Sequence, residues 1–514
     1  MSCTGSKLKT VYIREGDRYT LDRLRLILDC PKDQDKENLE IDKKIRRLKK
    51  LKAIRIIAPG DDTEDPDNPE LDYGVDYGTA AGCTRYWYSF TFVGVIVMDG
   101  RVILWCYPKY LLQGRNRWNP DPEDLKPEEL SRVKESLRQV VSVLKKYERQ
   151  NRSVGHQSPD DISRTQLGKD EIDSENLGVM LYLLDDYYES GLYTNTEEIR
   201  EWNGPGEIIW DRTINDACAM VVGGKPYYME MQTRRQVTDD MDYFLRLHKC
   251  VMTAVSREMN SSLLSLFGYP PIELSEQDLS EFGDVHYIQY RIERELNVQF
   301  NTRKQNVLKA MSLYIRGRHL EDNDHITTYG TNAFYQVWED ICSVILRNRL
   351  NFTLSSPALN LKAPPGVPYS SRSKLIDVIE HPTWTGLPAE GTLIPDIITK
   401  SGGQFCIFDT KYYIPVLEGP QAPLNQPGIE SVTKQYMYQL AYKPLTDYNG
   451  ITVIKNSFIF PTEQDDVCNA GDVELKMLHS LGLENIQIIC LPAKMAYAHY
   501  LTGRPLSLAE LKLR

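Results

Sequence analysis

The sharpest alternation of apolar and polar positions lies near the C-terminal end of the chain, from Leu393 to Tyr413. Two short apolar runs flank the polar segment 400–403, and this pattern predicts the strands and the turn of a β-hairpin. Charge interrupts both runs, because Asp396 lies within the first and Asp409 and Lys411 end the second. Side chains alternate along a strand, so Asp409 and Lys411 share a face, and Asp396 can approach Asp409 across the hairpin.

Two carboxylates and a lysine at one point form a recognisable chemical unit. Carboxylate oxygens are the ligands that Mg²⁺ prefers, and a bound metal polarises a phosphate and lowers the pKa of a bound water. We therefore expect Asp396, Asp409 and the adjoining Thr410 to bind Mg²⁺, with Mn²⁺ as a substitute. Lys411 would hold the attacking water or balance the charge on the phosphate.

The pattern Pro395-Asp396 followed by Asp409-Thr410-Lys411 resembles the PD-(D/E)xK nuclease motif. As letters alone the motif is weakly specific, and the alternative is a hairpin with incidental surface charges. A charged residue inside an apolar run is costly unless it is paired or bound to a metal, and two such places face each other here. The pattern therefore favours Asp396, Asp409 and Lys411 as catalytic residues.

Two predicted helices add candidate residues. The pair Gln439-x-x-Tyr442 lies on a helix predicted over 431–442. It resembles the motif that follows the active site in RecB-like nucleases, which implies a catalytic Gln439. Glu339 lies on an earlier helix, where many nucleases of this superfamily place one more acid. The alternatives are an ordinary amphipathic helix and a solvated glutamate. The apolar stripe that predicts the earlier helix consists of Phe334, Trp338, Ile341 and Ile345.

The first 58 residues have the pattern of a small helical unit with a strand at each end. Val11–Ile13 and Ala53–Ile57 are the predicted strands, and Thr20 is the expected N-cap of the first helix. A second helix presents a basic surface around the apolar positions Ile41, Ile45, Leu48 and Leu51. This combination suggests a winged-helix-like module that touches phosphate, and the alternative is a solvated basic helix.

A strong hairpin signal follows at residues 86–107, where Asp99-Gly100 separates two apolar runs. Further along, the chain reads as alternating helices and short strands. The predicted helices are 121–149, 177–188, 241–259 and 290–318, and the predicted strands or turns are 206–214, 226–230, 456–461 and 485–492. Gly223-Gly224-Lys225 is not a phosphate loop, since Ala219 and Pro226 replace the required glycine and hydroxyl residue.

Length and composition limit the class of protein. At 514 residues the chain is too long for one compact core. We predict three domains: 1–80 with a winged-helix-like module and an acidic loop, 81–290 for partner docking, and 291–514 as the nuclease. No apolar run reaches the length of a membrane span and no apolar signal core is present, so we expect a cytoplasmic protein. Ten cysteines without a CxxC pair argue against a zinc ribbon.

The net charge of −11 is unusual for a protein that acts on DNA. Affinity for phosphate comes mainly from lysine and arginine, so we expect weak DNA binding by the chain alone. A partner that delivers the DNA would resolve this tension.

The whole pattern resembles the LlaJI family of restriction endonucleases, which are similar to McrC nuclease subunits. The segments that carry the resemblance are 92–96, 106–110, 206–214, Leu247-His248, Phe334 with Trp338-Glu339, and the site at Asp396, Asp409 and Lys411. The resemblance implies a bacterial defence nuclease that cuts double-stranded DNA together with a McrB-like AAA+ GTPase. Homodimerisation on DNA is a further expectation.

The expected fold class is α/β, or α+β multidomain. A C-terminal PD-(D/E)xK nuclease with a mixed central sheet flanked by helices would follow N-terminal α+β regions that bind the partner or DNA. The alternative function is a non-catalytic adaptor that stimulates an NTPase, and the intact Asp396, Asp409 and Lys411 favour the nuclease. We expect the partner to contact the hairpin at 86–110 through Trp87, Trp105 and Tyr107, unless these aromatics belong to the core.

Overall fold

A computed structural model describes residues 9–30, 37–57, 86–98, 102–152, 175–238, 242–318, 326–415 and 426–514. Contacts divide the chain into two compact units, and each is described by itself. The described residues up to 152 and from 326 onward form the first unit, and residues 175–318 form the second. This grouping differs from the three consecutive domains expected from the sequence, which remain a prediction.

The first unit begins with a mixed four-stranded sheet of β1 (Lys9–Arg14), β6 (Val102–Tyr107), β5 (Val93–Met98) and β12 (Ile326–Thr331), in that order. β1 runs parallel to β6, whereas β5 pairs with β6 and β12 in antiparallel fashion. The predicted β5–β6 hairpin is thus confirmed, and its Asp99-Gly100 turn lies outside the described residues.

The apolar run at 86–98 is two strands instead of the single one expected. β4 (Trp87–Phe90) ends before β5 and pairs with β2 (Arg18–Tyr19) and β3 (Ile54–Ile57) in a separate sheet. Alternation alone did not reveal this break, because both strands are apolar. Trp105 and Tyr107 are buried in β6, with 4% and 2% of their surfaces exposed. The expectation that these two side chains contact a partner is therefore wrong, and they belong to the core.

The small sheet packs with α1 (Leu21–Ile27) and α2 (Glu37–Lys50) around one apolar core. Thr20 caps α1 as predicted, since its hydroxyl accepts a hydrogen bond from the N–H of Arg23. The predicted acidic loop between these elements and β4 lies outside the described residues. Phosphate binding by the basic helix α2 remains a prediction. The long charged helix predicted over 121–149 is α3 (Pro127–Arg152).

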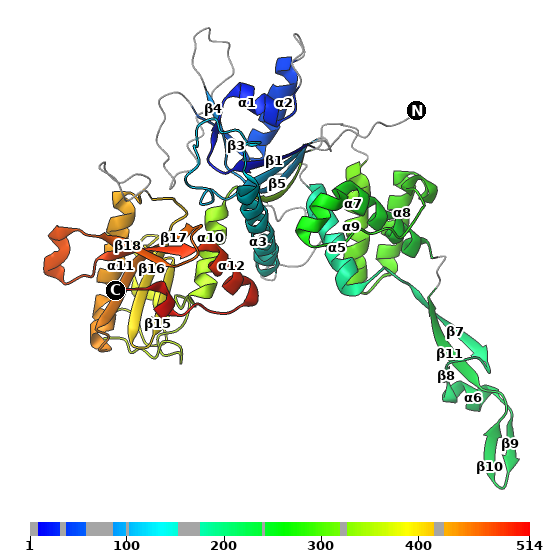
Figure 1. Ribbon diagram of the computed structural model, residues 1–514. Coiled ribbons are helices and arrows are strands. Elements are labelled where there is room, and N and C mark those ends of the chain that lie inside the picture. Colours follow the sequence, from blue (N-terminus) through cyan, green and yellow to red (C-terminus); the bar gives the residue numbers. More distant parts are fainter. Residues whose placement is uncertain are drawn as a thin grey trace. The chain divides into compact units, whose positions relative to one another are not determined.

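The C-terminal part of the first unit is built on a mixed five-stranded sheet, as expected (Figure 1). Its order is β15 (Ile397–Ser401), β16 (Gln404–Thr410), β17 (Val453–Thr462), β19 (Ile486–Pro492) and β18 (Cys468–Val473). β16, β17 and β19 are parallel, and the edge strands β15 and β18 are antiparallel to their neighbours. The helices that pack on this sheet are α10 (Phe334–Ile345), α11 (Ile429–Tyr448) and α12 (Ala493–Thr502).

The second unit combines helices with an extended arm. The helices are α5 (Glu175–Ser190), α7 (Tyr243–Phe267), α8 (Val285–Val298) and α9 (Thr302–Arg318). The stretch expected as one helix over 290–318 is thus two helices, α8 and α9. Within this unit, Figure 1 shows the arm projecting from the helices.

The arm contains short strands and one helix. Its elements are β7 (Thr196–Trp202), β8 (Glu207–Ile208), α6 (Trp210–Asp216), β9 (Ala219–Val222), β10 (Lys225–Tyr228) and β11 (Gln232–Thr238). The segment 206–214 is therefore partly helical. Gly223 and Gly224 have positive φ angles of 60° and 80° and form the turn between β9 and β10. Among the described helices of both units, none is both long and apolar enough to cross a membrane.

A buried histidine lies in α7 of the second unit. The Nδ1 atom of His248 accepts a hydrogen bond of 2.9 Å from the N–H of Tyr193. Its Nε2 atom is buried and has no hydrogen-bond partner within the described part of the chain. Burial, with a smaller contribution from the Arg303 charge, lowers the pKa of His248 to about 3. The imidazole is therefore neutral in the folded protein at neutral pH.

The buried His248 should make the stability of the second unit depend on pH. Below about pH 6.5 the unfolded chain binds a proton that folded His248 excludes, so stability falls as the pH drops toward the folded pKa. The loss is on the order of 2 kcal/mol at about pH 5. His248→Asn keeps an acceptor for Tyr193 without a titrating group and should flatten this dependence. Hydrogen exchange of α7 peptides across a urea series, at neutral pH and at about pH 5, measures the stability of this unit. Equal pH dependence in both proteins would contradict the assignment.

Candidate active site

The β15–β16 hairpin sets the positions of the predicted carboxylates. Gly402 and Gly403 form its turn with φ angles of 57° and 82°, a left-handed conformation that glycine adopts without steric cost. Ile397 pairs with Phe408 in the antiparallel register, so Asp396 lies opposite Asp409 just beyond the last pair. The hairpin and the approach of its charged ends are thus confirmed.

Asp409 and Lys411 lie on the same face at the end of β16 and form an ion pair. Lys411 Nζ is 3.1 Å from Asp409 Oδ2, and the two side chains are only 13% and 12% exposed. The N–H of Lys411 donates to Ile459 O at 2.9 Å, which ties the strand end to β17. A carboxylate and an ammonium are therefore held together in a place with little access to bulk water.

Asp396 is held against the same strand end by hydrogen bonds. Its Oδ2 atom accepts from the N–H of Thr410 at 2.8 Å and from the Thr410 hydroxyl at 3.0 Å. Desolvation raises the pKa of Asp396, although the Thr410 hydrogen bonds and the charge of Lys411 act in the opposite direction. Thr410, expected at the metal site, thus donates to a carboxylate that would be a ligand.

Asn348, which follows α10, was missed in the sequence. Its amide N–H donates to Asp396 O at 2.8 Å, and its carbonyl accepts from the N–H of Ile398 at 3.1 Å. The asparagine therefore fixes the backbone on both sides of the point where β15 begins. The preceding Arg347 has a φ of 56°, which ends the helix and turns the chain toward the hairpin. Apolar periodicity contains no signal for such a contact.

Glu339 on α10 joins this cluster from a distant part of the chain. Desolvation and the negative charges of Asp396 and Asp340 raise the pKa of Glu339 to about 7, and Lys411 lowers it. Glu339 as a residue is exposed to solvent, although its carboxyl is partly desolvated. The structure thus places Glu339 and Asp396 within electrostatic range of each other and of Lys411, which forms the ion pair with Asp409.

Tyr438 on α11 is a second residue that the sequence did not single out. Its hydroxyl donates to Ile394 O at 2.9 Å, which anchors the segment leading into Asp396. Desolvation, followed by the negative charges of Asp409 and Asp396, raises the pKa of Tyr438. The phenol is therefore a neutral donor beside the carboxylates.

Gln439 has a different position from the other candidates. Its buried amide lies within hydrogen-bond distance of Asn456 and of the backbone of Glu484, at 2.7 to 3.2 Å. The neighbouring Tyr442 donates to Leu375 O at 3.0 Å. These contacts hold α11 on the sheet. Gln439 thus lies among structural partners, and its catalytic role remains a prediction.

Comparisons with known proteins identify the family of the chain. The LlaJI restriction endonuclease family matches residues 92–358 and 367–494. The Type II restriction enzyme BsuMI component YdjA of Bacillus subtilis (strain 168) is 24% identical over 444 residues, covering 82% of this chain and 83% of that protein. The cryo-EM structure of the Thermococcus gammatolerans McrBC complex is 13% identical, with a TM-score of 0.24, over 65% of this chain and 86% of that one. That TM-score is too low to carry an argument about fold. The family match spans well over half of the sequence, and the chain therefore belongs to the LlaJI restriction endonuclease family.

Proposed function

We propose that this chain is the metal-dependent endonuclease subunit of a bacterial restriction system and hydrolyses phosphodiester bonds in double-stranded DNA. The observation that carries the proposal is the convergence of Asp396, Asp409 and the Lys411 ammonium at the end of one hairpin. The family membership supports the same class of reaction.

The donor set suits Mg²⁺. Within the described residues, no group of three His, Cys, Asp or Glu side chains is arranged to hold a metal ion by itself. Mg²⁺ is commonly bound through one or two carboxylates together with substrate phosphates and water, so Asp396 and Asp409 would suffice when DNA is present. Desolvation raises the pKa values of Asp396 and Glu339, so their ionised forms are unfavourable here, and a bound divalent cation would favour those forms.

The residues of the chain have separable roles in this proposal. When bound, Mg²⁺ polarises the scissile phosphate and lowers the pKa of a coordinated water. Asp396 and Asp409 hold the cation, and Thr410 orients Asp396 through two hydrogen bonds. Lys411 balances the negative charge that develops on the phosphate or holds the attacking water. Glu339, with a pKa of about 7, is suited to accept a proton near neutral pH.

We also propose a McrB-like AAA+ GTPase partner that recognises and translocates the DNA. The relative from Bacillus subtilis is named as one component of a restriction enzyme, which supports a multi-subunit assembly. The net charge of −11 disfavours strong DNA binding by this chain alone. Gly223 and Gly224 form a hairpin turn instead of a phosphate loop, so the nucleotide would be bound elsewhere.

The arm of the second unit replaces the β5–β6 hairpin as the proposed contact with this partner. Exposed apolar side chains gather on β9, β10 and their flanks, which is unusual for a monomeric surface. The most exposed are Met229 at 71%, Val221 at 69%, Val222 at 57%, Ile214 at 55% and Tyr227 at 53%. An apolar arm of this kind is suited to insertion into a complementary groove on another subunit.

The first prediction from the proposed function concerns cleavage. In the full assembly with Mg²⁺, Asp409→Asn and Asp396→Asn should abolish cutting of a plasmid, because each removes a metal ligand. Lys411→Ala should lower the rate by roughly 10²- to 10³-fold with little change in metal affinity, because the Lys411 ammonium stabilises negative charge in the transition state. Single-turnover cleavage at saturating Mg²⁺ measures the rates.

The matched control is a carboxylate–lysine pair outside the site. Asp447 lies 3.3 Å from Lys443 on α11, and both side chains are partly exposed to solvent. Asp447→Asn should leave cleavage unchanged. Full cleavage by Asp396→Asn would reject the site, and GTPase stimulation without cleavage by the unmodified protein would favour the adaptor.

The second prediction concerns the protein without metal. Burial raises the pKa of Asp396 above its unfolded value, so the ionised carboxylate destabilises the fold once the pH exceeds the folded pKa. Asp396→Asn keeps an acceptor for Thr410 and should raise the unfolding temperature at neutral pH. In the presence of a short DNA duplex, added Mg²⁺ should stabilise the unmodified protein but not the variant. Calorimetry with and without Mg²⁺ measures both changes in unfolding temperature. Equal stabilisation of both proteins by Mg²⁺ would contradict the assignment.

The third prediction concerns the arm. Val221→Ser combined with Met229→Ser should weaken binding of the AAA+ subunit by about tenfold or more, because it removes apolar area from the contact. Met477→Ser is the control, since Met477 is 77% exposed on the nuclease unit. Interferometry with the purified AAA+ subunit measures the affinities, and unchanged binding by the arm variant would remove the arm from the interface.

A further inference from the structure

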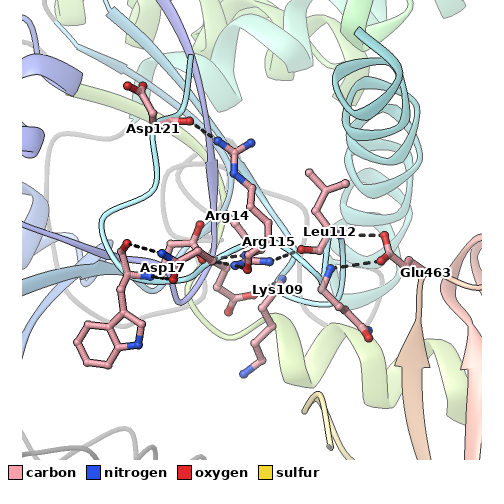
Figure 2. Close-up of polar contacts among 11 residues, drawn as sticks. Arg14, Asp17, Lys109, Leu112, Arg115, Asp121 and Glu463 are labelled. Atoms are coloured by element: carbon pink, nitrogen blue, oxygen red, sulfur yellow. Dashed lines mark hydrogen bonds and ion pairs between the residues drawn. The ribbon is translucent and has the colours of Figure 1, made fainter. Parts of the chain in front are cut away.

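The end of β1 is a buried junction in the first unit. Arg14 is completely buried and donates from Nε to Asp17 Oδ1 at 2.7 Å. Its guanidinium also donates to Leu112 O, and to Arg115 O at 3.0 Å. These bonds hold the chain after β6 around one cation, as Figure 2 shows. A buried guanidinium needs such partners, so this loop has a fixed conformation relative to β1.

The same loop is attached to the part of the chain that contains the five-stranded sheet. Glu463, which follows β17, accepts from the N–H of Leu112 at 2.8 Å and of Gln113 at 3.2 Å (Figure 2). The hydroxyls of Tyr110 and Tyr497 are 2.6 Å apart, and Tyr497 lies on α12. The N-terminal sheet and the five-stranded sheet of the candidate site are therefore joined by polar contacts, of which the Tyr110–Tyr497 contact is buried.

Glu15 connects this junction to the strand of the candidate active site through hydrogen bonds. Its carboxylate Oε2 accepts from the hydroxyl of Tyr412 at 2.7 Å and from the N–H of Lys109 at 3.4 Å. The N–H of Glu15 donates to Tyr107 O at 2.9 Å, which fixes its backbone to β6. Tyr412 directly follows Lys411, so a residue near the N-terminus holds the neighbour of the candidate lysine.

Tyr412 is enclosed on several sides. Lys109 Nζ lies 4.8 Å from the centre of its ring, and the rings of Phe334 and Tyr110 lie at 5.3 and 6.4 Å. Burial and the charge of Glu15 raise the pKa of Tyr412 well above its ordinary value, so the phenol stays protonated and donates. The ring is thus held by a hydrogen bond at its tip and by packing along its faces and edges.

We propose that Glu15 is a positioning residue for Lys411 and acts through Tyr412; this inference rests on the function proposed above. The regular strand ends at Thr410, and the N–H of Lys411 makes a further bond to Ile459 O. Beyond that point Glu15 anchors the chain through the Tyr412 side chain. Tyr412 directly follows Lys411, so anchoring the Tyr412 side chain restrains the backbone from which the Lys411 side chain extends.

The test compares Glu15 with another carboxylate of the same interface. Glu15→Ala and Tyr412→Phe should lower kcat by roughly 10- to 100-fold with KM unchanged, because a small displacement of a catalytic group costs rate more than binding. Glu15→Gln keeps an acceptor for the Tyr412 hydroxyl and should restore kcat to within about threefold. Glu463→Ala breaks the interface without touching the Lys411 strand and should retain kcat.

A second readout is independent of cleavage. Hydrogen exchange of the Lys411 amide, measured by NMR on [¹⁵N]lysine-labelled protein without DNA or metal, should accelerate about tenfold in Glu15→Ala, because the strand end loses its anchor. The same amide should be unchanged in Glu463→Ala, and its resonance is assigned by its loss in Lys411→Arg.

The outcomes separate this inference from the proposed function. If the unmodified protein does not cut DNA in the full assembly with Mg²⁺, the proposed function fails, and the exchange rate still decides whether Glu15 anchors Lys411. Unchanged exchange in Glu15→Ala overturns the positioning role. An equal loss of kcat in Glu463→Ala also overturns it, because the effect would then belong to the whole interface.

Discussion

The register of the β15–β16 hairpin is the constraint on which the candidate site depends. Two glycines in left-handed conformation close the turn and place Asp396 opposite Asp409. A slip by one residue would send every side chain of the strand to the other face of the sheet. The apolar residues of β15 and β16 are buried in the core and resist such a slip. Packing of apolar side chains thus determines where two acids meet.

Bringing these acids together has an electrostatic cost that shapes their surroundings. Desolvation raises the pKa values of Asp396 and Glu339, and the negative charges of Asp396 and Asp340 raise that of Glu339 further. The Lys411 ammonium and the Thr410 donors offset part of this cost. Such unfavourable negative charge favours the binding of a cation and, with it, a phosphate. The same electrostatic interactions therefore affect both the stability of the metal-free protein and its proposed chemistry.

Residues far apart in the chain hold the site in place. Asn348 fixes the start of β15, Tyr438 fixes the segment before it, and Glu15 reaches the residue after Lys411. Each bond ends on backbone or on a neighbour of a candidate catalytic residue. Precision at the site therefore depends on α10, α11 and the N-terminal sheet together. The exposed apolar arm of the second unit has no such internal role, which is why we assign it to a partner.

The sequence by itself determined the hairpin, its charged ends and the helices that flank it. Alternation along a strand and the 3.6-residue period of a helix are local properties, and the acids and lysine of the motif lie within a short stretch. It also indicated the family. Tertiary structure alone decided that Trp105 and Tyr107 are core, that the run at 86–98 divides between two sheets, and that Gln439 contacts Asn456. It likewise brought Glu15 and Asn348 to the site. Contacts between residues distant in sequence depend on how the sheets and helices pack together, and no local pattern encodes that packing.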